Sequence, residues 1–174
     1  MLFRSGVGAR FFPSFSQTPN PNSLEEVIRA SFIMASRRIG ALIALQREAS
    51  LEDYAATGTR LDARTSTELL LAIFHPTSPM HDGAVMIREG IALSAKVFLP
   101  LSLGRDLSRF YGTRHRAAIG LTEETDAVVI IVSEERGTVS IVTGGVLQPV
   151  ADANEMREKL LECFRPGAAR RRTP

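Results

Sequence analysis

Two short and mainly apolar runs, at positions 40–45 and 127–133, limit the folds that this chain can adopt. Runs of this length are too short for stable helices, and they lack the polar positions of a half-exposed strand. They are typical of strands that are buried on both faces of a sheet. The sequence therefore predicts a central sheet with other elements packed on both sides.

Further strands are expected in hairpins. Glu89-Gly90 and Gly144-Gly145 are typical turn sequences, and each stands between two apolar stretches. These stretches are 85–88 with 91–99, and 138–143 with 146–150. Hairpins with helices before, between and after them indicate an α/β protein with a central mixed β-sheet flanked by helices, not a repeating βαβ unit.

Helices are predicted where a capping residue precedes apolar positions at helical spacing. Ser23 with Glu26, and Thr65 with Glu68, have the spacing of a capping box. Thr113 and Asp152 are the expected N-caps of two further helices. The expected helices are 23–38, 65–74, 113–121 and 152–164, the last with Met156, Leu160, Leu161 and Phe164 facing inward. Residues 46–64 are mixed in character and rich in turns.

The length of 174 residues suits one domain with a real core. We expect this domain at 23–165, after an irregular linker at 1–22 and before a disordered, arginine-rich tail at 166–174. The formal net charge is only +2, and the tail carries several arginines. The domain itself is therefore close to neutral, which argues against a nucleic-acid groove.

The chain has one cysteine, Cys163, so no intrachain disulfide can form. No apolar run is long enough to span a bilayer. The sequence therefore gives no sign of an oxidising compartment, and the chain as given is expected to be soluble.

Chemistry is first suggested by the stretch 79–87, in which His81 and Asp82 precede a glycine turn and an apolar strand. A strand fixes direction, so a carboxylate at its start can be aimed at a ligand. Gly83 and Ala84 let a bulky group approach the backbone. An Asp-Gly pair before a strand is more often an ordinary turn, and this alternative stands for the motif taken alone.

The second motif is Gly112-Thr113-Arg114-His115-Arg116 at an expected helix start. Cations are unfavourable at the positive end of a helix dipole unless an anion binds there. A phosphate can accept hydrogen bonds from helix amides, the Thr113 hydroxyl and arginine together. Consecutive helical side chains diverge by about 100°, so the three basic residues cannot all contact one phosphate. A solvated basic turn is the alternative.

The third motif, Ser133-Glu134-Glu135, follows the strongest strand, where ligand-binding residues of α/β sheets often gather. His81, Asp82 and one of the two glutamates would supply nitrogen and oxygen ligands suited to Mn²⁺, or less readily to Mg²⁺. Carboxylates for a metal and a helix terminus for phosphates together indicate a nucleotide site.

These motifs closely resemble the diadenylate cyclase (DAC) domain family. The resemblance is carried by Asp82-Gly83-Ala84, by 112–120 (GTRHRAAIG) and by Val132-Ser133-Glu134-Glu135, and it extends from about Leu24 to Phe164. It also includes 37–43 (RRIGALI) and Glu68-Leu69-Leu70. Within the family the chain is most similar to the membrane-anchored CdaA type.

The resemblance implies a nucleotidyltransferase that condenses two ATP molecules into the second messenger cyclic di-AMP and releases two pyrophosphates. It implies catalytic roles for Asp82, Arg114, His115 and Arg116, and a divalent cation, Mn²⁺ or Mg²⁺, on His81, Asp82 and Glu135. ATP would contact Gly83, Ala84, Leu99, Thr113, Arg114, Ser133 and Glu134. Adenine would lie against Leu99, with Phe98 beside it. The alternative is that both residues belong to the core of an ordinary strand. Which of Glu134 and Glu135 binds the cation stays open.

The resemblance also implies a face-to-face homodimer, in which each ribose 3′-hydroxyl attacks the α-phosphorus of the other ATP. It implies a cytoplasmic domain at the inner face of the cell membrane, held there by an upstream segment missing from this chain, with regulatory proteins as possible partners. The alternative is a catalytically silent module that binds ATP or cyclic di-AMP and regulates a partner. A general anion- or RNA-binding module is disfavoured by the near-neutral domain and the few aromatic residues.

Overall fold

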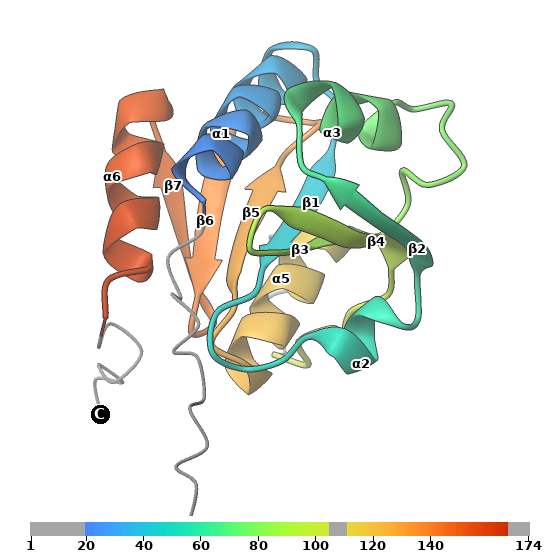
Figure 1. Ribbon diagram of the computed structural model, residues 1–174. Helices are drawn as coiled ribbons and strands as arrows, with labels where there is room; N and C mark the ends of the chain where they lie inside the picture. The colour runs from blue at the N-terminus through green and yellow to red at the C-terminus, as the bar shows by residue number, and fades with distance from the viewer. Residues whose placement is uncertain (1–19, 105–110, 167–174) are drawn as a thin grey trace, which may run out of the picture.

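The computed structural model describes residues 20–104 and 111–166, and its centre is a seven-stranded sheet (Figure 1). The strand order is β2-β4-β3-β1-β5-β6-β7. The pair β1–β3 is parallel and the other neighbouring pairs are antiparallel. The predicted mixed sheet is thus confirmed. Its strands are β1 (Ala41–Leu45), β2 (Thr59–Arg64), β3 (Ala84–Arg88), β4 (Ile91–Val97), β5 (Val128–Val132), β6 (Val139–Thr143) and β7 (Val146–Val150).

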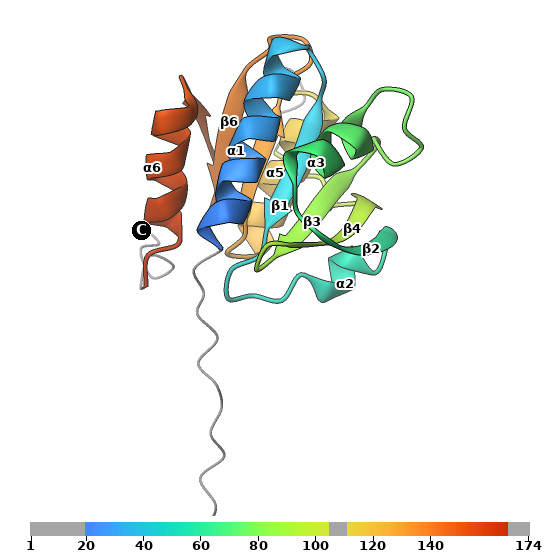
Figure 2. The same ribbon diagram turned by 45° about the horizontal axis from the view of Figure 1, so that its top comes forward.

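Helices cover both faces of the sheet. The helices α1 (Pro21–Ser36), α3 (Thr67–Phe74) and α6 (Ala153–Cys163) lie side by side on one face, as Figures 1 and 2 show. The other face is covered by α5 (Thr113–Glu124) and by the short helix α2 (Glu52–Ala55) near β4. None of these helices, within the described residues, has the length and apolar character needed to cross a membrane.

The central strand β1 contributes to two separate cores. Ala41, Ile43 and Leu45 pack with the α1 side of the sheet. Leu42 and Ala44 pack with the α5 side. All five residues are buried, which explains why the sequence of this strand shows no polar alternation.

The structure corrects several predicted helix ends. The first helix begins at Pro21, inside the segment predicted as a linker, and its N-cap is Asn20, whose side chain accepts a hydrogen bond from Asn22 N. Ser23 is therefore not the cap. A proline in the first turn is favourable because its missing N–H would have had no partner in the helix. Residues 1–19 and 167–174, which hold most of the predicted linker and tail, lie outside the described residues.

Two other caps are displaced by one residue from their predicted positions. Ser66, not Thr65, caps α3, and it accepts a hydrogen bond from Leu69 N at 3.1 Å. Gly112, not Thr113, is the N-cap of α5, and it has no side chain to cap with. Asp152 caps α6 as predicted.

Two further expectations were wrong. Leu161 was expected to face inward but is 49% exposed, whereas Met156, Leu160 and Phe164 are buried. Residues 46–64 contain α2 and β2, which the sequence did not indicate. Strand β2 lies at the sheet edge, is mostly exposed and has an irregular register with β4 near Asp62, so it lacks the apolar alternation by which strands are recognised.

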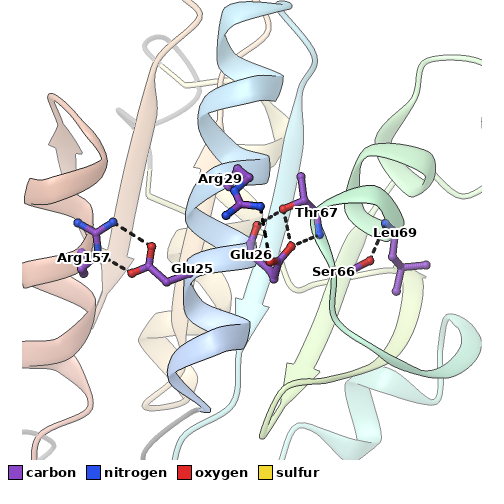
Figure 3. Close-up of polar contacts among 7 residues, drawn as sticks. All are labelled: Glu25, Glu26, Arg29, Ser66, Thr67, Leu69 and Arg157. Atoms are coloured by element: carbon purple, nitrogen blue, oxygen red, sulfur yellow. Dashed lines mark hydrogen bonds and ion pairs between the residues drawn. The ribbon is translucent and has the colours of Figure 1, made fainter.

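Helix α1 is tied to both neighbouring helices by adjacent glutamates (Figure 3). Glu26 accepts hydrogen bonds from Thr67 N at 2.7 Å and from Thr67 Oγ1 at 2.6 Å. It therefore satisfies a free amide at the start of α3 with a negative charge, where the helix dipole favours one. Glu25 forms a two-point ion pair with Arg157 of α6.

We predict that Glu26→Ala lowers the free energy of unfolding by about 2 kcal/mol, because it removes charge-assisted hydrogen bonds and leaves the backbone amide of Thr67 without a partner. Chemical denaturation followed by circular dichroism measures this loss. The matched control is Glu25→Ala, which removes an exposed ion pair and should cost less than about 1 kcal/mol. Equal losses in the two variants would contradict the assigned role of Glu26.

The same contact predicts a dependence on pH. The hydrogen bonds from the side chain and then the backbone of Thr67 lower the pKa of Glu26 from its ordinary value of 4.5. A lowered pKa in the folded state stabilises the fold above the ordinary pKa, and this contribution is lost as the pH falls through the lowered one. Denaturation midpoints measured from pH 7 down to about pH 3 should therefore fall less steeply in Glu26→Gln than in the parent chain.

Candidate functional site

A cleft of about 680 Å³ opens at the ends of the central strands, where β1 and β3 begin and β4 and β5 end. Strand pairing brings these ends together: β1 runs parallel to β3 and antiparallel to β5, and β4 runs antiparallel to β3. The start of α5 forms one wall. The cleft is lined by Leu42, Asp82, Gly83, Val97, Phe98, Leu99, Leu101, Gly112, Thr113, Arg114, His115, Ala117, Val132, Ser133, Glu134 and Glu135.

The structure therefore brings all three predicted motifs to one cleft. Most of the predicted site residues line it, namely Asp82, Gly83, Leu99, Thr113, Arg114, His115, Ser133, Glu134 and Glu135. Three others do not, namely His81, Ala84 and Arg116. The assigned role of each residue stays a prediction.

Asp82 and Gly83 form the entry to β3. Gly83 has a φ of 116°, and a Cβ atom there would lie 2.9 Å from the backbone of Lys96 and Val97. The residue must therefore be glycine for β4 to pass so close. The space that glycine provides here is used by the neighbouring strand. Ala84 is fully buried in β3 on the far side of this turn.

The predicted metal ligands are only partly gathered. Asp82 and Glu135 both line the cleft. His81 does not, and its Nδ1 lies 2.6 Å from the backbone oxygen of Ser78 in its own loop. Within residues 20–104 and 111–166, no three histidine, cysteine, aspartate or glutamate side chains form a cluster that could hold a metal ion. A cation in this cleft would therefore need ligands from a bound molecule as well as from the chain.

The N-terminus of α5 faces the cleft through Gly112, Thr113, Arg114 and His115. Because its N-cap is a glycine, no side chain among the described residues caps the first turn. The amides at a helix start carry a partial positive charge and suit an anion. An anionic group in the cleft would find these amides and the Arg114 guanidinium on the same wall.

Arg114 reaches from α5 to the turn after β5. Its Nη1 lies 3.3 Å from Glu134 Oε2, and the two side chains are 27% and 57% exposed. An ion pair with this exposure is weak, on the order of 1 kcal/mol or less. The guanidinium is thus held at the cleft by a contact that a stronger anion can replace.

His115 and Arg116 point in different directions, as their adjacent positions in a helix require. The His115 ring stacks on Tyr111, with centroids 5.3 Å apart and an angle of 24° between the planes. Burial lowers the pKa of His115, and Arg136 and Arg114 lower it further against the opposing effect of Glu135. The neutral imidazole is therefore favoured.

Arg116 does not line the cleft, but its backbone supports the segment that does. Its carbonyl oxygen accepts a hydrogen bond from Ser102 N at 3.0 Å, which holds the segment after β4 against α5. Its side-chain Nε is buried and has no hydrogen-bond partner among the described residues. Ser133 has a comparable structural bond, because its Oγ accepts a hydrogen bond from Arg136 N at 3.2 Å.

The cleft also has an apolar part that the motifs did not reveal. Four apolar residues of the cleft lie in strands or in α5, namely Leu42, Val97, Ala117 and Val132. From the sequence alone, an apolar residue at such a position is predicted to belong to the core. Leu99 and Leu101 continue this surface, and Phe98 is 63% exposed beside them. The cleft thus joins an apolar region to a wall formed by the Arg114 guanidinium and the amides at the start of α5. This arrangement suits a ligand with a flat apolar part and an anionic part.

Comparison with known proteins agrees with this geometry. The family model described as DAC, DisA bacterial checkpoint controller nucleotide-binding, matches residues 28–147. A diadenylate cyclase of Listeria monocytogenes is 45% identical over 80% of this chain and 51% of its own length. The cyclic di-AMP synthase CdaA of Bacillus subtilis is 43% identical over 87% of this chain and 56% of its own length. The chain thus spans about half the length of these relatives.

Solved structures show the same fold. The crystal structure of DacA from Staphylococcus aureus, a double mutant, has a TM-score of 0.79 and 41% sequence identity, and the match covers 83% of this chain and 97% of that one. A structure described as a hypothetical membrane spanning protein from Bacillus cereus has a TM-score of 0.71 and 40% identity, over 74% of this chain and 63% of that one. The matched residues include all three motifs of the cleft, and the chain therefore belongs to the DAC family of nucleotide-binding domains.

Proposed function

We propose that this chain is the catalytic domain of a diadenylate cyclase, which condenses two ATP molecules into cyclic di-AMP and two pyrophosphates. The observation that carries the proposal is the cleft, in which Asp82, the start of α5 and the turn after β5 meet beside an apolar surface. Relatives named diadenylate cyclase and cyclic di-AMP synthase support the same reaction.

The wall formed by Arg114 and the start of α5 is proposed to bind the triphosphate. Arg114 can offer a planar pair of donors to phosphate oxygens, and the amides of Thr113 and its neighbours lie on the same wall. The hydroxyls of Thr113 and Ser133 are further donors at the cleft. His115, which is favoured as the neutral imidazole, can add a hydrogen bond without adding to the charge. Glu134 would then exchange its contact with Arg114 for water or a ribose hydroxyl.

The apolar part is proposed to bind adenine. Leu99 and Leu101 line the cleft next to the segment that Ser102 fixes to α5, so this surface is held in place before the ligand arrives. Phe98, which is mostly exposed, can close over the base. A flat base buried between such side chains gains the free energy of removing apolar surface from water.

Asp82 is proposed to act on the ribose 3′-hydroxyl. Each 3′-oxygen forms a bond to the α-phosphorus of the other ATP, while the bond from that phosphorus to the bridging oxygen breaks and pyrophosphate leaves. The hydroxyl proton has to be removed, and the carboxylate of Asp82 is the group at the strand start that can accept it. The reaction needs this positioning more than it needs covalent help from the protein.

A divalent cation, Mn²⁺ or Mg²⁺, fits this cleft if the nucleotide supplies part of its ligands. One or two carboxylates with phosphate oxygens are a common arrangement for Mg²⁺. Asp82 is the main proposed ligand and Glu135 the second, because both line the cleft. His81 would join them only if its loop turned toward the cleft. When bound, such a cation offsets phosphate charge and makes a nearby hydroxyl more acidic.

The active form is proposed to be a homodimer with its two clefts facing each other. One cleft holds one ATP, so a single chain holds a nucleophile without its target phosphorus. The exposed side chains of Phe98 and Leu101, which line the cleft, offer an apolar surface for such a contact. We further propose that the domain works at a membrane, as the words 'membrane spanning' in the name of the Bacillus cereus neighbour suggest. We place it at the cytoplasmic face and propose that regulatory proteins act on it there.

The direct test is to incubate the purified chain with ATP and Mn²⁺ and to separate the products by chromatography. Cyclic di-AMP and pyrophosphate in a ratio of about one to two are expected from the balance of the reaction. Binding of ATP without turnover would instead favour a regulatory module. Weak binding of any polyanion that disappears with added salt would indicate a general anion site.

We predict that Asp82→Asn leaves the fold intact and lowers the rate of cyclic di-AMP formation by at least about a hundredfold, the range expected when a general base is lost. The matched control is Asp62→Asn, on the exposed strand β2, which should keep the parent rate. Circular dichroism checks the fold of both variants. Parent rates from Asp82→Asn would remove Asp82 from the proposed chemistry.

We also predict that turnover per subunit rises with protein concentration until the dimer is saturated, because two clefts must meet. Initial rates over a wide range of enzyme concentration measure this. Excess Asp82→Asn subunits should inhibit the parent protein, since mixed dimers bind two ATP molecules but lack one carboxylate. A constant turnover per subunit, with no inhibition by the variant, would argue for a reaction within one chain.

A further inference from the structure

Gly40 lies where helix α1 has ended and strand β1 begins, and the functional motifs do not include it. It is buried. A Cβ atom on this residue would lie 2.6 Å from Cζ of Arg114 and 2.9 Å from Oε2 of Glu134. The Arg114 guanidinium and its ion-pair partner therefore rest directly on the backbone of Gly40.

The backbone of Gly40 gives no other reason for a glycine. Its φ lies outside the positive region that side chains rarely adopt, unlike that of Gly83 or Gly144. An alanine could therefore follow the same backbone path. The atoms in its way are the ends of two flexible side chains, and these can move without disturbing the core. What the glycine provides is room for the Arg114–Glu134 pair.

A second contact joins the same turn to the turn after β5. Arg38 Nη1 donates a hydrogen bond to the backbone oxygen of Glu135, next to Glu134. Arg38 also lies close to Gly137, where a Cβ atom would be 3.4 Å from its Nε. The segment from Arg38 to Gly40 thus supports both the turn that carries Glu134 and the guanidinium that Glu134 contacts.

We infer that Gly40 is a positioning residue for the triphosphate site, because it leaves room for the Arg114 guanidinium against the start of β1, where Arg114 lines the cleft. The inference rests on the proposed function, since it assigns Arg114 to the phosphates of ATP. A side chain at position 40 displaces the Arg114 guanidinium from its place against the start of β1. Nucleotide binding then weakens although the fold is unchanged.

The experiment compares Gly40→Ala with Gly144→Ala. The probe is 3′-deoxy-ATP, which keeps the triphosphate but has no 3′-hydroxyl to react, and its dissociation constant is measured by titration calorimetry with Mn²⁺ present. Gly40→Ala is expected to raise this constant about 10- to 100-fold, as for the loss of a hydrogen bond to a charged group. Its melting temperature should stay near that of the parent, because only side-chain ends have to move.

Gly144→Ala is the matched control. Gly144 lies in the β6–β7 turn with a φ of 55°, and a Cβ atom there would meet nothing within 4 Å. The substitution strains the backbone, so the melting temperature falls, but the dissociation constant should not change. The two variants thus distinguish the effect of a lower stability from the effect of a displaced Arg114 guanidinium. If Gly40→Ala binds the probe as tightly as the parent does, the inference is overturned.

A double-mutant cycle with Arg114→Ala tests whether Gly40 acts through Arg114. In the Arg114→Ala background, Gly40→Ala should cause little further loss of affinity, because the group it displaces is already gone. If the fold-losses of affinity in the two single variants multiply in the double variant, Gly40 does not act through Arg114, and the inference is overturned. If the parent chain fails to bind the probe, the proposed function is wrong. If the parent chain binds the probe and Gly40→Ala binds it equally well, only the inference about Gly40 is wrong.

Discussion

The pairing of β1 with β3 on one side and β5 on the other is the constraint on which the rest of the structure depends. Ala41 lies opposite Val132 in the antiparallel pair, and Ile43 lies opposite Val85 in the parallel one. This register places the start of β1, the start of β3 and the end of β5 next to one another, at the same end of the sheet. Because β1 is buried on both faces, a slip by one residue would exchange the side chains of its two cores. The core therefore fixes which loops can meet at the cleft.

The strands and the class of fold could be predicted because burial on both faces leaves a plain apolar pattern. Helix starts could not be predicted as well, since several residues near each start can cap it at similar cost. Ser23 and Glu26 have capping-box spacing, yet Asn20 caps α1 and Glu26 binds Thr67 of another helix. This choice is made by tertiary contacts. Strand β2 was missed for a related reason, because an exposed edge strand has little need of apolar residues.

The polar half of the cleft was visible in the sequence and the apolar half was not. Charged and glycine-rich motifs stand out beside apolar strands, so the stretches around Asp82, Arg114 and Ser133 could be identified and are now seen to meet. Leu42 and Val132 carry no such signal, because a strand residue that lines a cleft looks the same as one in the core. The direction of the His81 side chain, which turns to its own loop, was also beyond the sequence. Helix spacing predicted that the side chains of Arg114, His115 and Arg116 diverge, but it did not say that Arg116 is the one that does not line the cleft.

The Arg114–Glu134 pair explains how a cationic site can be kept ready for an anion. A guanidinium free in solvent samples many rotamers and loses that entropy when it binds. Here Glu134 restricts those rotamers in advance, at a separation of 3.3 Å and with both groups partly in water. Solvent screening keeps the pair weak, so the triphosphate that we propose as the ligand, with its several negative oxygens, can replace Glu134 as the partner of Arg114 at little cost. A buried pair at the same place would resist the exchange, because a separated carboxylate without solvent is strongly unfavourable. Partial exposure of this pair is therefore what reconciles an ordered site with one that can still bind its ligand.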